Sequence, residues 1–259
     1  MIVLGLDTST AATAVALRLA DGSTTQARDD PPAGAHPGHA TRLLDMAHEL
    51  LMGAGIAWSA LDRIAVGLGP GTFTGLRVGV ASARGLAQSL SVELVGVSSP
   101  RALAAAALAD DAAGTAGGAD AAGRGAVLAV LDARRGEVFA AAYELGDQGL
   151  PDELAAPRAL APQQLSSILA EAQQSAGSEP RRWLAVGDGA IRFRGALEEA
   201  GIPTAPDCSP LHLISAASIC ELGLRTAMAS LQEIVPDYRR RPDAELALEG
   251  AGTATGFLT

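Results

Sequence analysis

The chain has 259 residues, of which 48% are hydrophobic and 19% are charged, which is enough to bury a core in one large domain or two small ones. Its formal net charge of -10 at pH 7 would repel phosphate backbones, which excludes the class of proteins that hold nucleic acid alone through a basic surface. No apolar stretch approaches the roughly 20 residues of a membrane-spanning helix, and the first residues lack the basic region of a secretion signal, so we expect a cytoplasmic protein that does not contact a membrane.

Strand-like and helix-like patterns alternate through the first part of the chain. Residues 2–7 predict a strand, and residues 13–19, with apolar side chains at every second position, predict its partner in a hairpin. Apolar residues at helical spacing predict a helix over 39–53, which the following glycines end. The next predicted elements are a strand over 63–69, a glycine-rich turn, a helix from about 72 to 90 and a strand over 92–98.

The second part of the chain begins again with a hairpin. A stretch rich in Ala, Gly and Asp over 109–125 has too little bulky apolar content to pack, and it predicts a mobile linker. Residues 126–145 then predict a second hairpin with its turn at 133–136. The patterns that follow predict helices over 162–175, 191–200 and 212–231, a strand over 183–189 and a frayed polar end.

Two hairpin-led α/β halves are typical of the two-lobed actin/Hsp70-like fold, also called the ASKHA or RNase H-like fold. We therefore predict an α/β protein with duplicated domains. The predicted divisions are a first lobe made from 1–108 together with 209–235, a linker over 109–125, a second lobe over 126–208 and a polar tail over 236–259.

Asp7, Thr8, Ser9 and Thr10 follow the first predicted strand. Their pattern resembles the first phosphate loop of ATPases with this fold, in which an Asp helps to hold hydrated metal while hydroxyl and backbone N–H groups hold phosphate. The alternative is a tight turn in which the same side chains bond to their own backbone. The sequence leaves both interpretations open.

A glycine-rich turn at 67–71 leads into the predicted helix 72–90, and it matches neither a P-loop nor a dinucleotide-binding motif. Gly75, Gly79 and Ala83 recur every four residues, which gives this helix a smooth face that another helix can approach closely. We predict a partner interface here, with packing inside the same lobe as the alternative. The predicted interface residues are His39, Leu43, Leu44, Ala47, Leu51, Phe73, Gly75, Leu76, Gly79, Val80 and Ala83.

No catalytic or metal-binding constellation is recognisable. His36 and His39 are separated by Pro37 and Gly38, which disfavour a helix that would place both histidines on one face. No carboxylate completes a ligand set with them or with His48, and no Ser or Cys lies in a nucleophile elbow. We therefore predict no catalytic residues and no bound metal.

Several motifs, taken in order, resemble those of the TsaB (YeaZ) family along most of the chain. They are LDTST at 6–10, AVGLGPGTFTGLRVGVASARGLA at 65–87, LVGVSS at 94–99, LDARRGEVFAAAY at 131–143, VGDGA at 186–190 and PDYRR at 236–240. The resemblance implies a subunit that binds a TsaD-like catalytic subunit. It further implies that, together with a TsaE-like ATPase, the two transfer a threonylcarbamoyl group to the adenosine beside the anticodon of certain tRNAs.

The departures from an active relative imply a non-catalytic paralogue of TsaD. TsaD has a histidine motif after the strand that corresponds to LVGVSS, whereas this chain has no histidine in that region. Arg134 and Arg135 stand where active ATPases of this fold have a glycine-rich second phosphate loop. The resemblance therefore implies that ATP, ADP and metal belong to partner subunits and that tRNA is bound only through the complex. Asp7 to Thr10, with Gly187, Asp188 and Gly189, are then vestigial nucleotide-binding residues.

Two other functions fit the same residues. One is an active ATP-dependent transferase or metalloprotease of the same superfamily, which the LDTST motif favours and the missing histidines oppose. The other is a homodimeric interaction protein that has no role in RNA modification, because a smooth helix face would suit a second copy equally well. A homodimer of the free subunit is also compatible with the resemblance.

Overall fold

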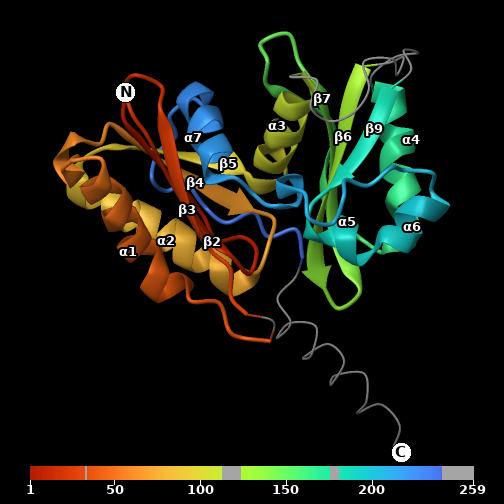
Figure 1. Cartoon of the computed structure of the whole chain (residues 1–259), viewed down its shortest axis with the longest axis horizontal. Coiled ribbons are helices and arrows are strands. Elements are labelled where there is room, and N and C mark those ends of the chain that lie inside the picture. Colours follow the sequence, from red (N-terminus) through yellow and green to blue (C-terminus); the bar gives the residue numbers. More distant parts are fainter. Residues whose placement is uncertain (33, 113–123, 176–180, 241–259) are drawn as a thin grey trace, which may run out of the picture.

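A computed structural model describes residues 1–32, 34–112, 124–175 and 181–240, and in it the chain forms two β-sheets with helices around and between them (Figure 1). The first sheet has the order β3-β2-β1-β4-β5. β1, β2 and β3 pair antiparallel, whereas β4 and β5 run parallel to β1. Its strands are β1 (Val3–Asp7), β2 (Thr13–Arg18), β3 (Thr24–Asp29), β4 (Arg63–Gly69) and β5 (Glu93–Ser98).

The second sheet, of order β8-β7-β6-β9, repeats this plan. β6, β7 and β8 pair antiparallel and β9 runs parallel to β6, so each sheet starts with a hairpin. The predicted fold class, a two-lobed actin/Hsp70-like α/β fold, is confirmed. The strands are β6 (Arg124–Arg134), β7 (Glu137–Leu145), β8 (Pro151–Leu160) and β9 (Arg181–Val186).

Helices cover both faces of the first sheet. α1 (His39–Gly53) and α2 (Phe73–Leu90) pack on the face that carries Leu4 and Leu6, whereas α7 (Ala216–Arg225) packs on the opposite face. α3 (Ser99–Ala112) lies between the two sheets (Figure 1), and the core around it includes residues of both, such as Val97 and Val127. The two lobes therefore share a continuous apolar core.

The outer face of the second sheet is covered by three helices, and short 3-10 turns complete the described elements. Apolar residues of the three helices form a separate core with the side chains of β6 and β7 that face them. The helices are α4 (Leu165–Ser175), α5 (Asp188–Arg192) and α6 (Arg194–Glu199), and the turns are η1 (Trp58–Ala60), η2 (Pro162–Gln164) and η3 (Pro210–His212).

Some predicted element boundaries are wrong. The helix predicted over 212–231 is confined to α7, because Ser215 caps its start by accepting a bond from the Ser218 N–H group and Thr226 leaves its end in an extended conformation. The helix predicted over 191–200 begins earlier and breaks at Phe193 into α5 and α6. Of the linker predicted over 109–125, residues 109–112 end α3 and residues 124–125 begin β6, while 113–123 lie outside the described residues.

Two strands were not predicted. β3 is an edge strand without apolar alternation, and β8 starts with a proline and pairs with β7 through register shifts. Among the described residues, no helix is both long and apolar enough to cross a membrane.

Candidate functional site

The small-residue face of α2 contacts the β1–β2 loop of its own lobe. A Cβ atom added at Gly75 would overlap the Thr8 carbonyl oxygen, and one added at Gly79 would overlap Thr8 Oγ1. Thr8 Oγ1 donates to the Gly75 carbonyl oxygen at 2.7 Å, and the Thr72 N–H group donates to the Ser9 carbonyl oxygen at 2.7 Å. The glycines therefore let this loop lie directly on the helix.

This packing corrects the predicted partner interface. Only Leu44 and Phe73 of the eleven predicted residues are exposed. The other nine are buried inside the first lobe, because their three- and four-residue spacing faces the sheet and the β1–β2 loop. The nine residues are His39, Leu43, Ala47, Leu51, Gly75, Leu76, Gly79, Val80 and Ala83.

The Asp7 carboxylate at the end of β1 is enclosed by its own lobe. It accepts bonds from the Ser9 N–H group at 2.9 Å, from Ser9 Oγ at 2.7 Å and from Ser99 Oγ at 2.7 Å. A side chain at Gly67 would overlap the same carboxylate. Burial raises the pKa of Asp7, and the bonds from Ser99 and Ser9 only partly oppose that shift. The geometry favours the tight-turn interpretation of LDTST.

An Asp7→Asn variant is expected to be at least as stable as the parent at pH 7. Because folding raises the pKa of Asp7, the folded state binds the proton more tightly than the unfolded state, and stability is lost as pH rises above 3.8. An amide keeps an oxygen for Ser9 and can donate to Ser99. Urea unfolding at several pH values should show a flatter pH dependence, and a loss above about 2 kcal/mol would contradict this assignment.

In the second lobe, the predicted Gly187–Asp188–Gly189 turn lies against the end of β6. The Asp188 carboxylate accepts bonds from the Asp132 N–H group at 3.0 Å and from the Gly189 N–H group at 2.9 Å. Burial raises the pKa of Asp188, and the neighbouring charge of Asp132 acts in the same direction. A side chain at Gly187 would overlap the Val130 carbonyl oxygen. The two sets of predicted vestigial residues therefore lie at different sheets, with Asp7 bonded at the end of β1 and Asp188 bonded to the end of β6.

Residues 234–240 connect the two lobes, although the residues from 236 onward were predicted to fray. Ile234 is buried in the core of the first lobe, and the Asp237 N–H group donates to the Leu68 carbonyl oxygen at 2.7 Å. Arg240 Nη1 donates to the Ala133 carbonyl oxygen of the second lobe at 2.8 Å. We call residues 234–240 the strap, and the PDYRR motif was the signal for it in the sequence. Residues 241–259 lie outside the described residues.

An exposed aromatic pair joins the strap to the start of α2. The rings of Phe73 and Tyr238 are 5.2 Å apart. The Arg77 guanidinium lies 3.7 Å from the centre of the Phe73 ring, and Arg77 Nε donates to the Tyr238 hydroxyl at 2.9 Å. This cluster is accessible from solvent, unlike the buried glycine face of α2.

The three histidines that were considered as metal ligands, His36, His39 and His48, lie in different environments. His36 is exposed, His39 Nδ1 is 2.9 Å from Thr13 Oγ1, and the His48 ring stacks on Trp58. Burial lowers the pKa of His39. Within the described ranges, no group of three His, Cys, Asp or Glu side chains is arranged to hold a metal ion.

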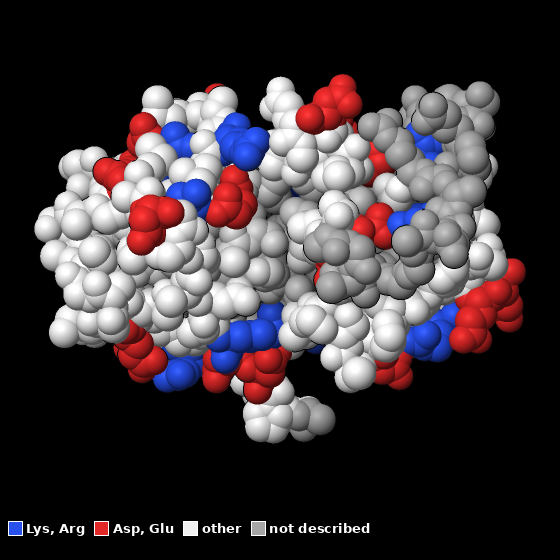
Figure 2. Space-filling model, turned by 45° about the horizontal axis from the view of Figure 1, so that its top comes forward, with Lys and Arg blue, Asp and Glu red and all other residues white. Residues whose placement is uncertain are grey.

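Charges of opposite sign lie close together over the face shown in Figure 2, with broad uncharged areas between them. Arg18 and Glu221, 2.5 Å apart, form one such pair of opposite charge in the described structure. The described part of that face presents no broad area of positive charge alone, so it does not offer a basic surface for nucleic acid.

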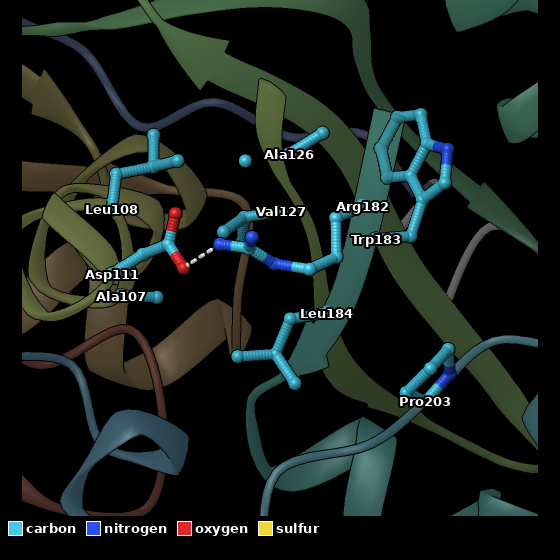
Figure 3. A pocket seen from close by; sticks show the side chains of 10 residues that line it. Ala107, Leu108, Asp111, Ala126, Val127, Arg182, Trp183, Leu184 and Pro203 are labelled. Atoms are coloured by element: carbon cyan, nitrogen blue, oxygen red, sulfur yellow. Dashed lines mark hydrogen bonds and ion pairs between the residues drawn. The ribbon is translucent and has the colours of Figure 1, made fainter. Parts of the chain in front are cut away.

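Two cavities lie away from the predicted residues. One, of about 180 Å³, is lined mainly by apolar side chains, and the Asp111 carboxylate points toward the Arg182 guanidinium at its edge (Figure 3). The other, of about 650 Å³, lies between the β2–β3 edge, α3 and residues 210–215. Neither is lined by a residue that was predicted to bind a partner or a nucleotide.

Comparisons with known proteins agree with this architecture. A family profile described as "TsaD: tRNA N6-adenosine threonylcarbamoyltransferase" matches residues 30–248. The chain is 28% identical to the tRNA threonylcarbamoyladenosine biosynthesis protein TsaB of Escherichia coli K12, over 96% of this chain and 99% of that protein. The chain belongs to the TsaB (YeaZ) family.

Two further matches have similar sequence identity. An uncharacterised protein of Mycobacterium tuberculosis H37Rv is 30% identical over 94% of this chain and 93% of its own length. The structure of YeaZ from Pseudomonas aeruginosa has a TM-score of 0.67 and 29% sequence identity, and the match covers 92% of this chain and all of that one. The likeness to TsaB and YeaZ thus extends over both lobes.

Proposed function

We propose that this chain is a non-catalytic subunit in the biosynthesis of threonylcarbamoyladenosine in tRNA, where it binds a TsaD-like catalytic subunit and acts with a TsaE-like ATPase. Its relatives from Escherichia coli and Bacillus subtilis carry the name tRNA threonylcarbamoyladenosine biosynthesis protein TsaB. The observation that most supports a non-catalytic role is the enclosure of the Asp7 carboxylate by Ser9, Ser99 and Gly67. A carboxylate directed into its own loop is not presented to a hydrated metal, as an ATPase of this fold would require.

The partner surface in this proposal is the outer face of α1 and α2. It contains exposed apolar side chains of α1 and a smooth stretch of α2, where nothing lies within 4 Å of a Cβ added at Gly85. An exposed apolar face on adjacent helices is suited to helix–helix association with another subunit. The residues of this outer face are Leu44, His48, Met52, Phe73, Arg77, Ala81 and Gly85.

An Ala81→Arg variant is expected to weaken association with the TsaD-like subunit on the order of a hundredfold, because a long charged side chain would hold the two helices apart. Ala81 is exposed, so the fold should tolerate the change. Isothermal titration calorimetry would give the affinity. Ala170→Arg, the same substitution on an exposed position of α4, is the matched control and should bind like the parent.

Reconstitution tests the whole proposal. Threonylcarbamoyladenosine formation on tRNA should require the chain together with the TsaD-like and TsaE-like subunits, and Ala81→Arg should lower product formation while Ala170→Arg does not. The isolated chain should not turn over ATP above about one per second. Full product formation without the chain, or faster turnover by the chain alone, would contradict the scaffold role.

A further inference from the structure

Helix α2 carries two arginines on one side. Arg77 and Arg84 are two helical turns apart, or about 10 Å along the helix axis, so both lie on the same side of the helix. Arg77 is exposed and Arg84 is half-buried. Residues 64–92 contain no Asp or Glu, and these two arginines are the charged side chains of that segment. This side of α2 therefore has a local positive charge on a protein whose net charge is -10.

Neither guanidinium group has a carboxylate partner among the described residues. Arginines elsewhere in the described chain commonly have one, as Arg18, Arg63 and Arg158 do. Arg77 instead bonds to a neutral hydroxyl and stacks on an aromatic ring, and no hydrogen bond or ion pair joins the Arg84 side chain to another described residue. Two neighbouring arginines without carboxylates favour a partner that supplies them.

The strap fixes the position of the Arg77 guanidinium. Arg77 Nε donates to the Tyr238 hydroxyl at 2.9 Å, and the guanidinium lies 3.7 Å from the centre of the Phe73 ring. Tyr238 is itself held by the strap backbone, because the Asp237 N–H group donates to the Leu68 carbonyl oxygen at 2.7 Å. The N–H groups on Nη1 and Nη2 of Arg77 have no acceptor among the described residues, so they remain available to a partner.

The groups beside the arginines favour a protein partner over a nucleic acid. Phe73 and Tyr238 are 38% and 44% exposed, and Ala81 and Gly85 leave a smooth exposed stretch on the same helix. Aromatic residues and arginine are enriched at the points where protein–protein interfaces gain most of their affinity. This combination fits another protein helix better than a phosphate backbone, which an uninterrupted basic surface would suit.

We propose that Arg77 and Arg84 bind two carboxylates of the TsaD-like subunit; the identity of that partner rests on the function proposed above. The carboxylates lie about two turns apart on a partner helix that runs along α2, because the arginines have this spacing. A guanidinium group binds a carboxylate in a bidentate manner and remains charged at all relevant pH values. The two ion pairs set the register of the partner helix, and Tyr238 is a positioning residue that acts through Arg77.

The first test compares Arg84→Met with Arg225→Met, which removes the same charge from an exposed position of α7 on the opposite face of the sheet. In calorimetric titration with the TsaD-like subunit at about 50 mM salt, Arg84→Met should bind about tenfold more weakly and Arg225→Met like the parent. At about 500 mM salt the difference should shrink, because ions screen the pair. Equal affinities of Arg84→Met and the parent at low salt would overturn the proposal.

Tyr238→Phe tests the positioning role, because it keeps the ring beside Phe73 and removes the hydroxyl that accepts from Arg77. It should weaken partner binding several-fold in the parent and should have no further effect in an Arg77→Met background. A hydroxyl that only fastens the strap would instead lower the thermal midpoint of the isolated chain and leave the affinity unchanged. That result, or an equal loss of affinity in both backgrounds, would show that Tyr238 does not act through Arg77.

The same titrations separate this inference from the function on which it rests. No binding of the parent to the TsaD-like subunit would overturn both. Binding that Ala81→Arg weakens, but that neither Arg77→Met nor Arg84→Met weakens, would overturn only the ion pairs. If the arginine variants weaken only self-association in sedimentation, or only tRNA binding, then the occupant is a second copy or RNA and the proposal is wrong.

Discussion

Replacing Ala83 by glutamate is expected to destabilise the chain by several kcal/mol, a large share of the stability of a typical domain. Ala83 is fully buried in the core that α2 forms with Leu4 and Leu6 of β1. Glutamate would add volume to a close-packed site and place a carboxylate where its neighbours are apolar. Circular dichroism and urea unfolding would measure the loss.

Ala81→Glu is the control for this result, because it is the same substitution on an exposed position of the same helix. It preserves helix propensity and net charge relative to the test variant, so it should stay within about 0.5 kcal/mol of the parent. If Ala83→Glu instead unfolds at the parent's urea midpoint, the assignment of this helix face to the lobe's own core is wrong.

Arg63→Met is expected to cost about 2–4 kcal/mol, because it removes a buried charge that joins three elements. Arg63 Nη1 donates to the Gly223 carbonyl oxygen at 2.6 Å and also contacts carbonyl oxygens beyond it at the end of α7. Arg63 Nη2 lies 2.5 Å from Glu93 Oε2 on β5. Methionine keeps most of the side-chain volume but leaves these acceptors without their donor.

Arg18→Met provides the comparison. Arg18 also forms a short ion pair, at 2.5 Å from Glu221, but that pair lies at the surface and should contribute less than about 1 kcal/mol. Urea midpoints of the two variants should therefore differ clearly. Equal losses would show that the carbonyl contacts of Arg63 do not contribute to holding α7 on the sheet.

Regular periodicity made much of the fold predictable. The two hairpins, the helix 39–53 and the strands at 63–69 and 92–98 were predictable because their side-chain periods match those of buried helices and strands. β3 and β8 lack such a period. β3 is an exposed edge strand and β8 carries bulges, so their pairing depends on neighbouring strands that are remote from the local pattern.

The sequence by itself determined the family and the α/β class, and it indicated that a chain segment, predicted to be another helix, packs closely on Gly75 and Gly79. The tertiary structure alone decided that this segment is the Thr8 loop of the same lobe, because small residues allow close contact with any backbone and do not specify which one. It also decided that residues 234–240 bring Arg240 to the β6–β7 hairpin, since charge spacing along a chain carries no information about contacts between distant segments.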